Sequence, residues 1–242
     1  MRFIAAFLLA ACAWAQGNGV AGHGQKQSPA PETASKEPGK SETLHYNVNW
    51  PSGLSLGEGQ LSASRQDDQW SFAISMEAAV PGFALTEAAK ATATSDYCSV
   101  ELEKKAKRGK RNVDETTMFD QKNLTAERKT NKGGKSELKI HSCAKDALTY
   151  VFFLRRELAA GRLPPAQSVY YGAAYQVRVN YTGVQSVRIG GEVIEADRLV
   201  AIIKGPASEI TADMYFARDA VRTPLRVEVP LPVGKFSLEL TR

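Results

Sequence analysis

The run EKKAKRGKR is the stretch of this sequence whose side chains most clearly suggest a binding site. It contains six basic residues around Gly109, namely Lys104, Lys105, Lys107, Arg108, Lys110 and Arg111. A basic side chain near an anionic lipid surface contributes about 1 kcal/mol to binding. The run therefore predicts a loop that contacts the anionic head groups of phospholipid or lipopolysaccharide. The alternative is a solvated hairpin tip that aids solubility.

The positive charge of the chain is concentrated around this run. Residues 101–139 carry 12 basic and 7 acidic side chains, a net charge of +5, whereas residues 43–242 together carry a net charge of +4. The run contains no aromatic residue on which a nucleic-acid base could stack. We therefore expect peripheral contact with a membrane and no nucleic-acid partner.

Residues that could perform catalysis are sparse. The three histidines are His23, His45 and His141, and the last two occupy strand-like positions between polar residues. The sequence contains none of the motifs of serine hydrolases, zinc peptidases, P-loop proteins or dinucleotide-binding proteins. The acidic pairs at 67–68 and 114–115 lie in turn-like segments, where we expect solvated carboxylates. We therefore predict no catalytic residue, no metal site, no cofactor and no enzymatic activity.

The N-terminal residues indicate export. Residues 1–15 have one basic residue, an apolar run too short to span a bilayer and a small-x-small site at 13–15, which is typical of a secretory signal peptide. Cleavage after Ala15 leaves a mature chain that begins at Gln16. The alternative is a lipobox at residues 9–12, in which Cys12 is lipidated. Both interpretations place the protein in the periplasm or outer envelope.

Two further cysteines, Cys98 and Cys143, follow the signal segment. In an oxidising compartment an isolated pair is expected to form a disulfide. The alternative is two buried thiols. No His or Cys stands at ligand spacing beside either cysteine, so the pair does not indicate a metal site.

The chain divides into a tether and a domain. Residues 16–42 contain no aromatic side chain and a single valine, so they cannot bury enough apolar surface to offset the entropy lost on ordering. We expect them to be a disordered tether. Residues 43–242 contain no linker rich in Pro and Gly and no internal repeat, which predicts a single β-rich domain.

Apolar and polar residues alternate in many segments of this domain. One segment places Trp70, Phe72, Ile74 and Met76 on one face, and similar rows begin near residues 44, 169, 210, 225 and 236. This period is typical of half-buried antiparallel strands. The predicted fold class is mainly β (α+β), with a long antiparallel sheet rolled into an open or half barrel around one buried helix.

That helix is predicted over residues 146–160. Asp146 is a suitable N-cap, and Gly161 is a suitable terminating residue. The first two turns are apolar on almost every side, which predicts that the helix is deeply buried against the apolar face of the sheet. A disulfide at Cys143 would attach the approach to this helix to the strand around Cys98. We expect Arg155 on the helix to pair with an acidic neighbour such as Glu209 or Asp219.

Three short motifs occur in this domain. They consist of Leu44, Tyr46 and Trp50; Asp146, Tyr150 and Arg155; and Asp219, Arg222, Pro224 and Gly234. In this combination the sequence resembles a bacterial family known as domain of unknown function 3108, over residues 43–242, with Tyr215 where the family often has Trp. The resemblance implies an exported β-rich domain without established catalytic residues, similar in architecture to the open barrels of lipoprotein carriers. The segment ARDAVRTP itself is typical of a turn between two strands.

Three functions are compatible with these features. The first is a non-catalytic binding or carrier module for a lipid-like or other hydrophobic ligand. The alternative is a structural or assembly factor of the envelope, with a filled core and a protein partner, and the third is a hydrolase without a recognisable motif. An apolar cavity of some hundreds of cubic ångströms would favour the first function. The bulk of Trp70, Tyr150, Phe152 and Phe153 could instead fill that space.

Overall fold

The computed structural model describes residues 41–80, 83–231 and 234–241. The predicted signal peptide, Cys12 and nearly all of the predicted tether lie outside these residues. Ser41 and Glu42, which the sequence assigned to the tether, belong to the first strand. The described fold therefore begins two residues earlier than predicted.

Within the described residues, 15 strands form one sheet, and a single helix accompanies it. The first eight strands are β1 Ser41–Asn49, β2 Ser55–Gln66, β3 Gln69–Val80, β4 Phe83–Thr94, β5 Ser99–Arg108, β6 Arg111–Asp120, β7 Thr125–Thr130 and β8 Lys135–Lys139. The others are β9 Lys145–Asp146, β10 Gln167–Tyr170, β11 Ala174–Ile189, β12 Glu192–Lys204, β13 Glu209–Ala217, β14 Pro224–Leu231 and β15 Gly234–Leu240. The helix α1, Ala147–Ala159, stands between β9 and β10.

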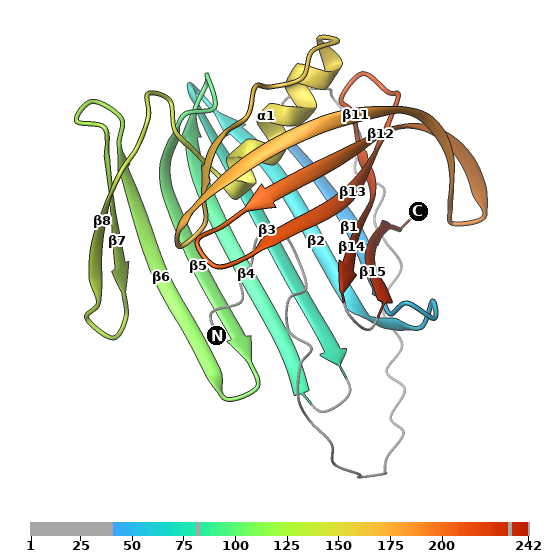
Figure 1. The fold of residues 1–242 in the computed structure, drawn as a ribbon, viewed down its shortest axis with the longest axis horizontal. Helices are drawn as coiled ribbons and strands as arrows, with labels where there is room; N and C mark the ends of the chain where they lie inside the picture. Colours follow the sequence, from blue (N-terminus) through green and yellow to red (C-terminus); the bar gives the residue numbers. More distant parts are fainter. Residues whose placement is uncertain (1–40, 81–82, 232–233, 242) are drawn as a thin grey trace.

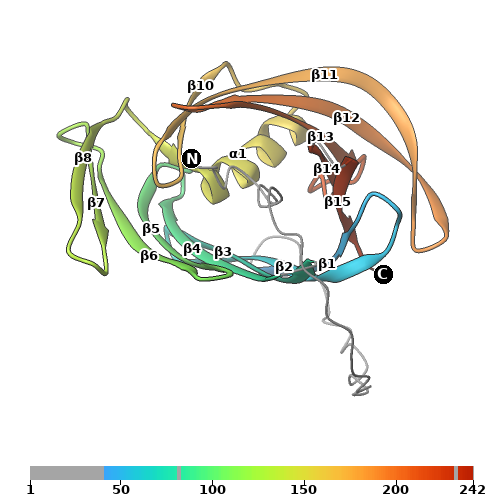
Figure 2. The same ribbon diagram turned by 60° about the horizontal axis from the view of Figure 1, so that its bottom comes forward.

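The sheet has two halves that meet at its middle. Its strand order is β8-β7-β6-β5-β4-β3-β2-β1-β15-β14-β13-β12-β11-β10-β9, so β1 lies beside β15 and the edges are β8 and β9. Figure 1 shows β1–β8 as one layer with β10–β13 crossing it, and Figure 2 shows the two layers curving around α1. The sheet is open rather than closed into a barrel. The prediction of a mainly β fold with an open, rolled sheet is confirmed.

One pair of strands departs from the predicted antiparallel arrangement. β9 and β10 run parallel, with Lys145 opposite Val169 and Asp146 opposite Tyr170. The connection between them contains α1, and a helical crossover returns the chain to the sheet in the same direction. The rest of the ladder is antiparallel, as predicted.

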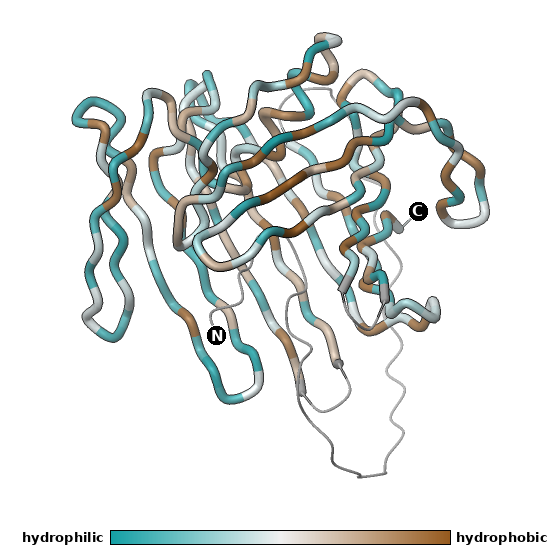
Figure 3. Tube along the Cα trace, in the orientation of Figure 1, coloured by the Kyte–Doolittle hydropathy of each residue, from teal (hydrophilic) through white to brown (hydrophobic). Residues whose placement is uncertain are grey.

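Alternation along the strands builds the core on the concave side of the sheet. In β3, Phe72 and Met76 are buried, whereas Ser75 and Glu77 between and beside them are exposed. Hydrophobic and hydrophilic residues alternate in this way along many strands, and the tip of the β5–β6 hairpin is hydrophilic (Figure 3). Burial of apolar area at about 25 cal/mol per Å² stabilises this face of the sheet.

The helix α1 lies between the two layers, and ten of its 13 residues are buried. Asp146 caps its first turn by accepting hydrogen bonds from the backbone N–H groups of Leu148 and Thr149. Phe152 stacks on Phe72 of β3, with ring centroids 4.3 Å apart. After the last turn, Gly161 adopts the left-handed conformation at φ 71°, which a glycine accommodates without a Cβ clash.

Cys98 and Cys143 form a disulfide that attaches the approach to α1 to the start of β5. Their α-carbons lie 4.5 Å apart, within the range of ordinary disulfides. The backbone N–H of Ser99 also donates to the carbonyl of Ala144, at 3.0 Å. The crossover from one edge of the sheet to the other is therefore held against β5 by a covalent bond and a hydrogen bond.

Candidate functional site

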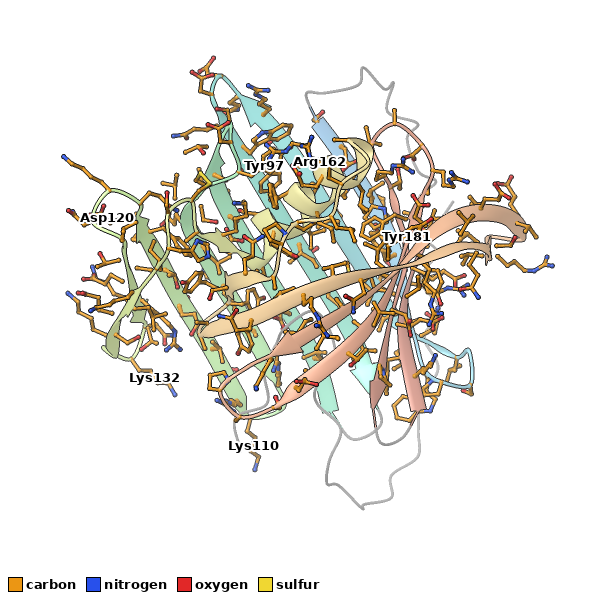
Figure 4. The ribbon with its side chains drawn as sticks, turned by 45° about the horizontal axis from the view of Figure 1, so that its top comes forward. Tyr97, Lys110, Asp120, Lys132, Arg162 and Tyr181 are labelled. Atoms are coloured by element: carbon orange, nitrogen blue, oxygen red, sulfur yellow. A yellow bond between two sulfur atoms is a disulfide. The ribbon has the colours of Figure 1, made fainter. Side chains whose placement is uncertain are left out.

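The basic run is divided by the strand that contains it. Lys104 and Arg108 lie on one face of β5, whereas Lys105 and Lys107 are exposed on the other face. Lys110 follows Gly109 at the tip of the β5–β6 hairpin and points away from the molecule (Figure 4). The six basic residues therefore do not lie together in one loop, because four of them belong to β5 and strand alternation sends neighbouring side chains to opposite faces.

On the concave face, Lys104 belongs to a buried ion-pair cluster. Its ammonium lies 2.9 Å from Glu115 on β6, and the Nε of Arg128 on β7 donates to the same carboxylate at 2.8 Å. Lys104 and Glu115 are 8% and 4% exposed, so neither is a solvated surface residue. The prediction that the 114–115 pair lies in a solvated turn is wrong for Glu115, because both residues lie within β6.

A second carboxylate, Glu87 on β4, completes the cluster. It accepts a hydrogen bond from Arg108 at 2.6 Å and one from the hydroxyl of Tyr171 at 2.6 Å. The ammonium of Lys104 lies 4.3 Å from the centroid of the Tyr171 ring, which favours a cation–π contact. Tyr171, between β10 and β11, thus contacts Glu87 on β4 and Lys104 on β5, two strands of the other half of the sheet.

The charges in this cluster set the protonation of its members. Burial alone raises the pKa of Glu115, but Lys104 and Arg128 outweigh it and hold the pKa of this carboxyl below its usual value. Burial, reinforced by Glu87, raises the pKa of the Tyr171 hydroxyl well above its usual value. Burial, reinforced by Glu115, raises the pKa of Tyr175 to about 12. At neutral pH Glu115 is therefore ionised, whereas Tyr171 and Tyr175 are neutral.

This cluster borders a partly open cavity of about 270 Å³, which we call the basic cavity. Its lining residues come from both halves of the sheet and are Lys104, Ala106, Arg108, Arg111, Val113, Glu115, Arg128, Tyr171, Gly172, Ala173, Tyr175, Pro206 and Ala207. Four cations face one carboxylate in this lining. The Nε of Arg108 is buried without a hydrogen-bond partner among the described residues. A buried donor without a partner costs about 1–3 kcal/mol, so a bound acceptor or water is favoured there.

Gly172, in the turn between β10 and β11, permits the close approach of this turn to the cluster. Its φ is 74°, and a Cβ added to it would lie 2.6 Å from Oε1 of Glu115. A larger residue would therefore clash with the ion pair that lines the basic cavity.

An apolar pocket lies beside the basic cavity, between α1 and strands β11–β13. It shares Tyr171 and Tyr175 with the basic cavity, and its other walls include Tyr150, Leu154 and Met214. Its volume is only about 30 Å³, whereas pockets for drug-sized ligands measure roughly 300–1,000 Å³. The described core between helix and sheet is therefore nearly filled by side chains.

The motif residues of the sequence meet at a structural junction. The hydroxyl of Tyr46 on β1 donates to the carbonyl of Pro224 at 2.9 Å. Arg155 on α1 donates to the carbonyls of residues 221 and 222 at 3.1 Å each and forms an ion pair with Glu42 on β1. These contacts join the first strand, the end of the helix and the turn before β14.

The expectation that Arg155 pairs with an acidic residue is confirmed, but its partner is Glu42 rather than Glu209 or Asp219. Asp219 instead accepts hydrogen bonds from the backbone N–H and the hydroxyl of Thr223, at 3.0 and 2.6 Å. Arg222 forms an ion pair with Asp197 on β12, at 2.8 Å. The predicted turn between two strands is confirmed, since Pro224 is the first residue of β14.

The remaining candidates lie apart from the basic cavity. His141 is held between the carbonyls of Ser142 and Ser168, at 3.0 and 3.1 Å, and His45 is exposed on β1. Asp67 lies in the turn after β2 with φ 51°. In the described ranges, no group of three or more His, Cys, Asp or Glu residues is arranged to hold a metal ion. The helix that the structure describes is too short to cross a membrane.

Comparison with known proteins identifies a family and a similar fold. Residues 43–241 match the family described as "Protein of unknown function (DUF3108)". No curated protein matches the chain. The crystal structure of a beta-barrel-like protein of domain of unknown function DUF1849, from Brucella abortus, superposes with a TM-score of 0.59 at 8% identity. The similarity covers 83% of this chain and 95% of that chain, and at such low identity it shows a shared fold alone. Since the family match spans almost all of the described residues, this chain belongs to the DUF3108 family.

Proposed function

We propose that this domain is a non-catalytic binding module of the cell envelope whose ligand is an anionic, lipid-like amphipath. The observation that supports this proposal is the lining of the basic cavity. Four cations, one of them with an unpartnered buried donor, stand beside apolar wall residues such as Val113 and Pro206. An anionic head group fits the cations, and a short apolar segment fits the walls.

The nearly filled core determines where such a ligand would sit. The apolar pocket beside α1 is too small for an acyl chain, so the ligand occupies the rim of the rolled sheet rather than its interior. The exported location follows from the signal-peptide pattern of residues 1–15. Peripheral contact with anionic lipid would use the outer cations Lys105, Lys107 and Lys110.

Arg111 offers the sharpest test of the basic cavity. It lines the cavity, is exposed and forms no ion pair among the described residues. Lys107 lies on the same hairpin but on the opposite face of β5 and outside the cavity. The variants Arg111→Gln and Lys107→Gln remove the same charge from the two faces.

The experiment is calorimetric titration with monomeric dodecyl phosphate, with dodecyl maltoside as the neutral control. We expect saturable binding of dodecyl phosphate, weakened about fivefold by Arg111→Gln, since one ionic contact contributes about 1 kcal/mol. Lys107→Gln should change the affinity less than twofold. Equal losses in both variants, or equal binding of the neutral detergent, would show that the cavity is not the binding site.

The filled core favours a second candidate function, a structural or assembly factor that acts through an envelope protein. Native mass spectrometry of the protein isolated from its own envelope separates the two candidates. A copurifying anionic lipid supports the binding module, and a copurifying protein subunit without lipid supports the assembly factor.

A further inference from the structure

A second groove opens at the C-terminal end of α1, apart from the basic cavity. Its volume is about 260 Å³, and its lining is mainly apolar. We call it the aromatic groove, because its walls include Trp70 of β3, Tyr97 of the β4–β5 turn and Phe152 of α1. It shares no lining residue with the basic cavity.

The rings at this groove form an ordered stack. Trp70 and Phe72 are nearly parallel, with centroids 5.7 Å apart and planes inclined by 13°. Phe72 in turn stacks on Phe152 at 4.3 Å, and Tyr97 lies 5.7 Å from Trp70. A flat apolar or aromatic body can continue such a stack, because offset ring contacts contribute about 0.5–1.5 kcal/mol beyond simple burial.

The backbone of Tyr97 indicates that the position of its ring is enforced. Its φ is 61°, in the left-handed region that non-glycine residues rarely adopt. The adjacent disulfide at Cys98 and the hydrogen bond from Tyr97 N–H to the carbonyl of Thr94 hold this turn. Figure 4 shows Tyr97 close to the end of the helix. Strained positions of this kind cluster at ligand-binding sites.

Two polar features of the groove point to the chemistry of a ligand. The indole Nε1 of Trp70 is buried and donates to no described acceptor. The guanidinium of Arg156 lies 4.8 Å from the centroid of Tyr97 and remains exposed, whereas that of Arg155 is already bound to Glu42 and two carbonyls. Glu42, which also lines the groove, is paired with Arg155, and Arg156 contacts Glu157 at 3.1 Å. The neutral donor is therefore Trp70, and the cation that remains accessible to a ligand is Arg156.

We infer that the aromatic groove binds a small anionic ligand with a flat aromatic or apolar body. Its body lies against Trp70 and Tyr97, an acceptor atom receives the indole N–H, and its anionic group lies near Arg156. This site is additional to the basic cavity, and neither proposal depends on the other.

Anilinonaphthalene sulfonate is a suitable probe, because it combines a flat ring system with one negative charge. N-phenylnaphthylamine carries the same rings without the sulfonate and serves as the neutral control. We expect the sulfonate probe to bind in the aromatic groove about tenfold more tightly than the neutral probe. Its binding should move the indole N–H resonance of Trp70 in a two-dimensional NMR spectrum and leave that of Trp50 in place.

Two substitutions test the groove directly, and two others act as controls. Trp70→Phe keeps an aromatic ring but removes the N–H donor, and Arg156→Gln removes the cation. Each should weaken binding of the probe about three- to tenfold, the range for one lost hydrogen bond or ionic contact. Arg162→Gln breaks an ion pair with the same Glu157 that Arg156 contacts, but Arg162 does not line the groove. Arg111→Gln removes a cation from the basic cavity. Neither control should change the affinity more than twofold.

These variants distinguish binding in the aromatic groove from non-specific binding of the dye and from binding in the basic cavity. An equal loss in Arg156→Gln and Arg162→Gln, or in Arg111→Gln, would overturn it. So would an unshifted Trp70 resonance in a protein that still binds the probe. Because Arg156 is exposed, its variant should keep the melting temperature of the parent protein, so a change in affinity cannot be assigned to unfolding.

Discussion

The carboxylate of Asp146 satisfies four donors in the interior of the protein. One oxygen accepts the backbone N–H groups of Leu148 and Thr149, at 2.8 and 3.0 Å. The other accepts the hydroxyls of Thr149 and Ser99, at 2.6 and 2.5 Å. Asp146 is fully buried, so water cannot replace these contacts. One side chain thus caps the helix and joins it to β5.

Replacing Asp146 with alanine should destabilise the protein strongly. The helix loses its cap, and several buried donors lose their acceptor, which together costs about 2–4 kcal/mol. Urea unfolding followed by circular dichroism measures the loss. Asp120→Ala is the matched control, because Asp120 also accepts two backbone N–H groups but in an exposed turn. A loss no larger than that of the control would show that the buried network contributes little.

Glu115 should give the protein an acid-sensitive part of its stability. Its pKa is lowered in the folded state, so the carboxylate stabilises the fold above the ordinary glutamate value of about 4.3. This contribution is lost as the pH falls from that value through the lowered pKa. We therefore measure the free energy of unfolding by urea titration between pH 7 and pH 3. As the pH falls over this range, it should decrease less for Glu115→Gln than for the parent protein. Glu137→Gln, at an exposed position of β8, should follow the parent curve.

The sequence indicates some of these residue-scale features but not their partners. The cap at Asp146 was predictable, because an acidic residue before an apolar helical run is a local signal. The inward position of Lys104 could have been found from its place between Leu102 and Ala106, two apolar residues at period 2. Glu87 and Tyr171, however, are 84 residues apart and meet only after the sheet rolls up. No local pattern reports such a contact.

At the scale of elements, the main feature of the fold is the segment that carries the chain from one edge of the sheet, β8, to the other edge, β9. The chain leaves β8, passes Cys143, forms α1 and rejoins the sheet through β10. Period-2 alternation predicted the long strands, and the cap at Asp146, the apolar run and Gly161 predicted the helix, because these signals are local. The order in which strands pair was not predictable, since it depends on contacts between distant segments. The two-residue β9 is too short to give any periodic signal.

Reduction of the disulfide should release this crossover from β5. The two cysteines are 45 residues apart, so loss of the cross-link removes at most about 4 kcal/mol of unfolding free energy in the chain-entropy account. We expect the urea midpoint of the parent to fall on reduction and that of a Cys98→Ala/Cys143→Ala variant to stay constant. Thiol counting in denaturant, without reductant, should find neither cysteine free in protein made in an oxidising compartment. Two free thiols there would contradict the prediction.

At the scale of the whole molecule, the described part of the rolled sheet has a nearly filled interior, and both the basic cavity and the aromatic groove open to the surface. Its outer cations at the β5–β6 hairpin, Lys105, Lys107 and Lys110, are free to face a membrane. We expect the protein to bind anionic vesicles more than neutral ones, and less as salt rises, since exposed charges are screened over about 8–10 Å near physiological ionic strength. Replacing these three lysines with serine should remove most of that binding, as measured by vesicle sedimentation.

The β7–β8 region supplies a control with the same change in charge. Lys122, Lys132 and Lys139 are exposed there, and their replacement with serine should leave vesicle binding nearly intact. Equal losses in the two triple variants would show that net charge alone drives the binding. Surface substitutions of this kind change stability by only about 0.5 kcal/mol, so both variants should fold.

The pairing of β1 with β15 determines when the fold can be completed. These strands align Tyr46 with Leu240 and Asn49 with Ser237, and the N–H of Thr241 donates to the carbonyl of His45 at 2.8 Å. Of the described strands, β1 is synthesised first and β15 last. The edge of β1 that pairs with β15 therefore remains without a hydrogen-bonding partner until synthesis of the chain is nearly complete. A bare edge is a template for pairing with another chain. A nascent or truncated chain that lacks β15 therefore consists of two half-sheets with unprotected edges, which is the form that a holding chaperone would recognise and that would otherwise aggregate.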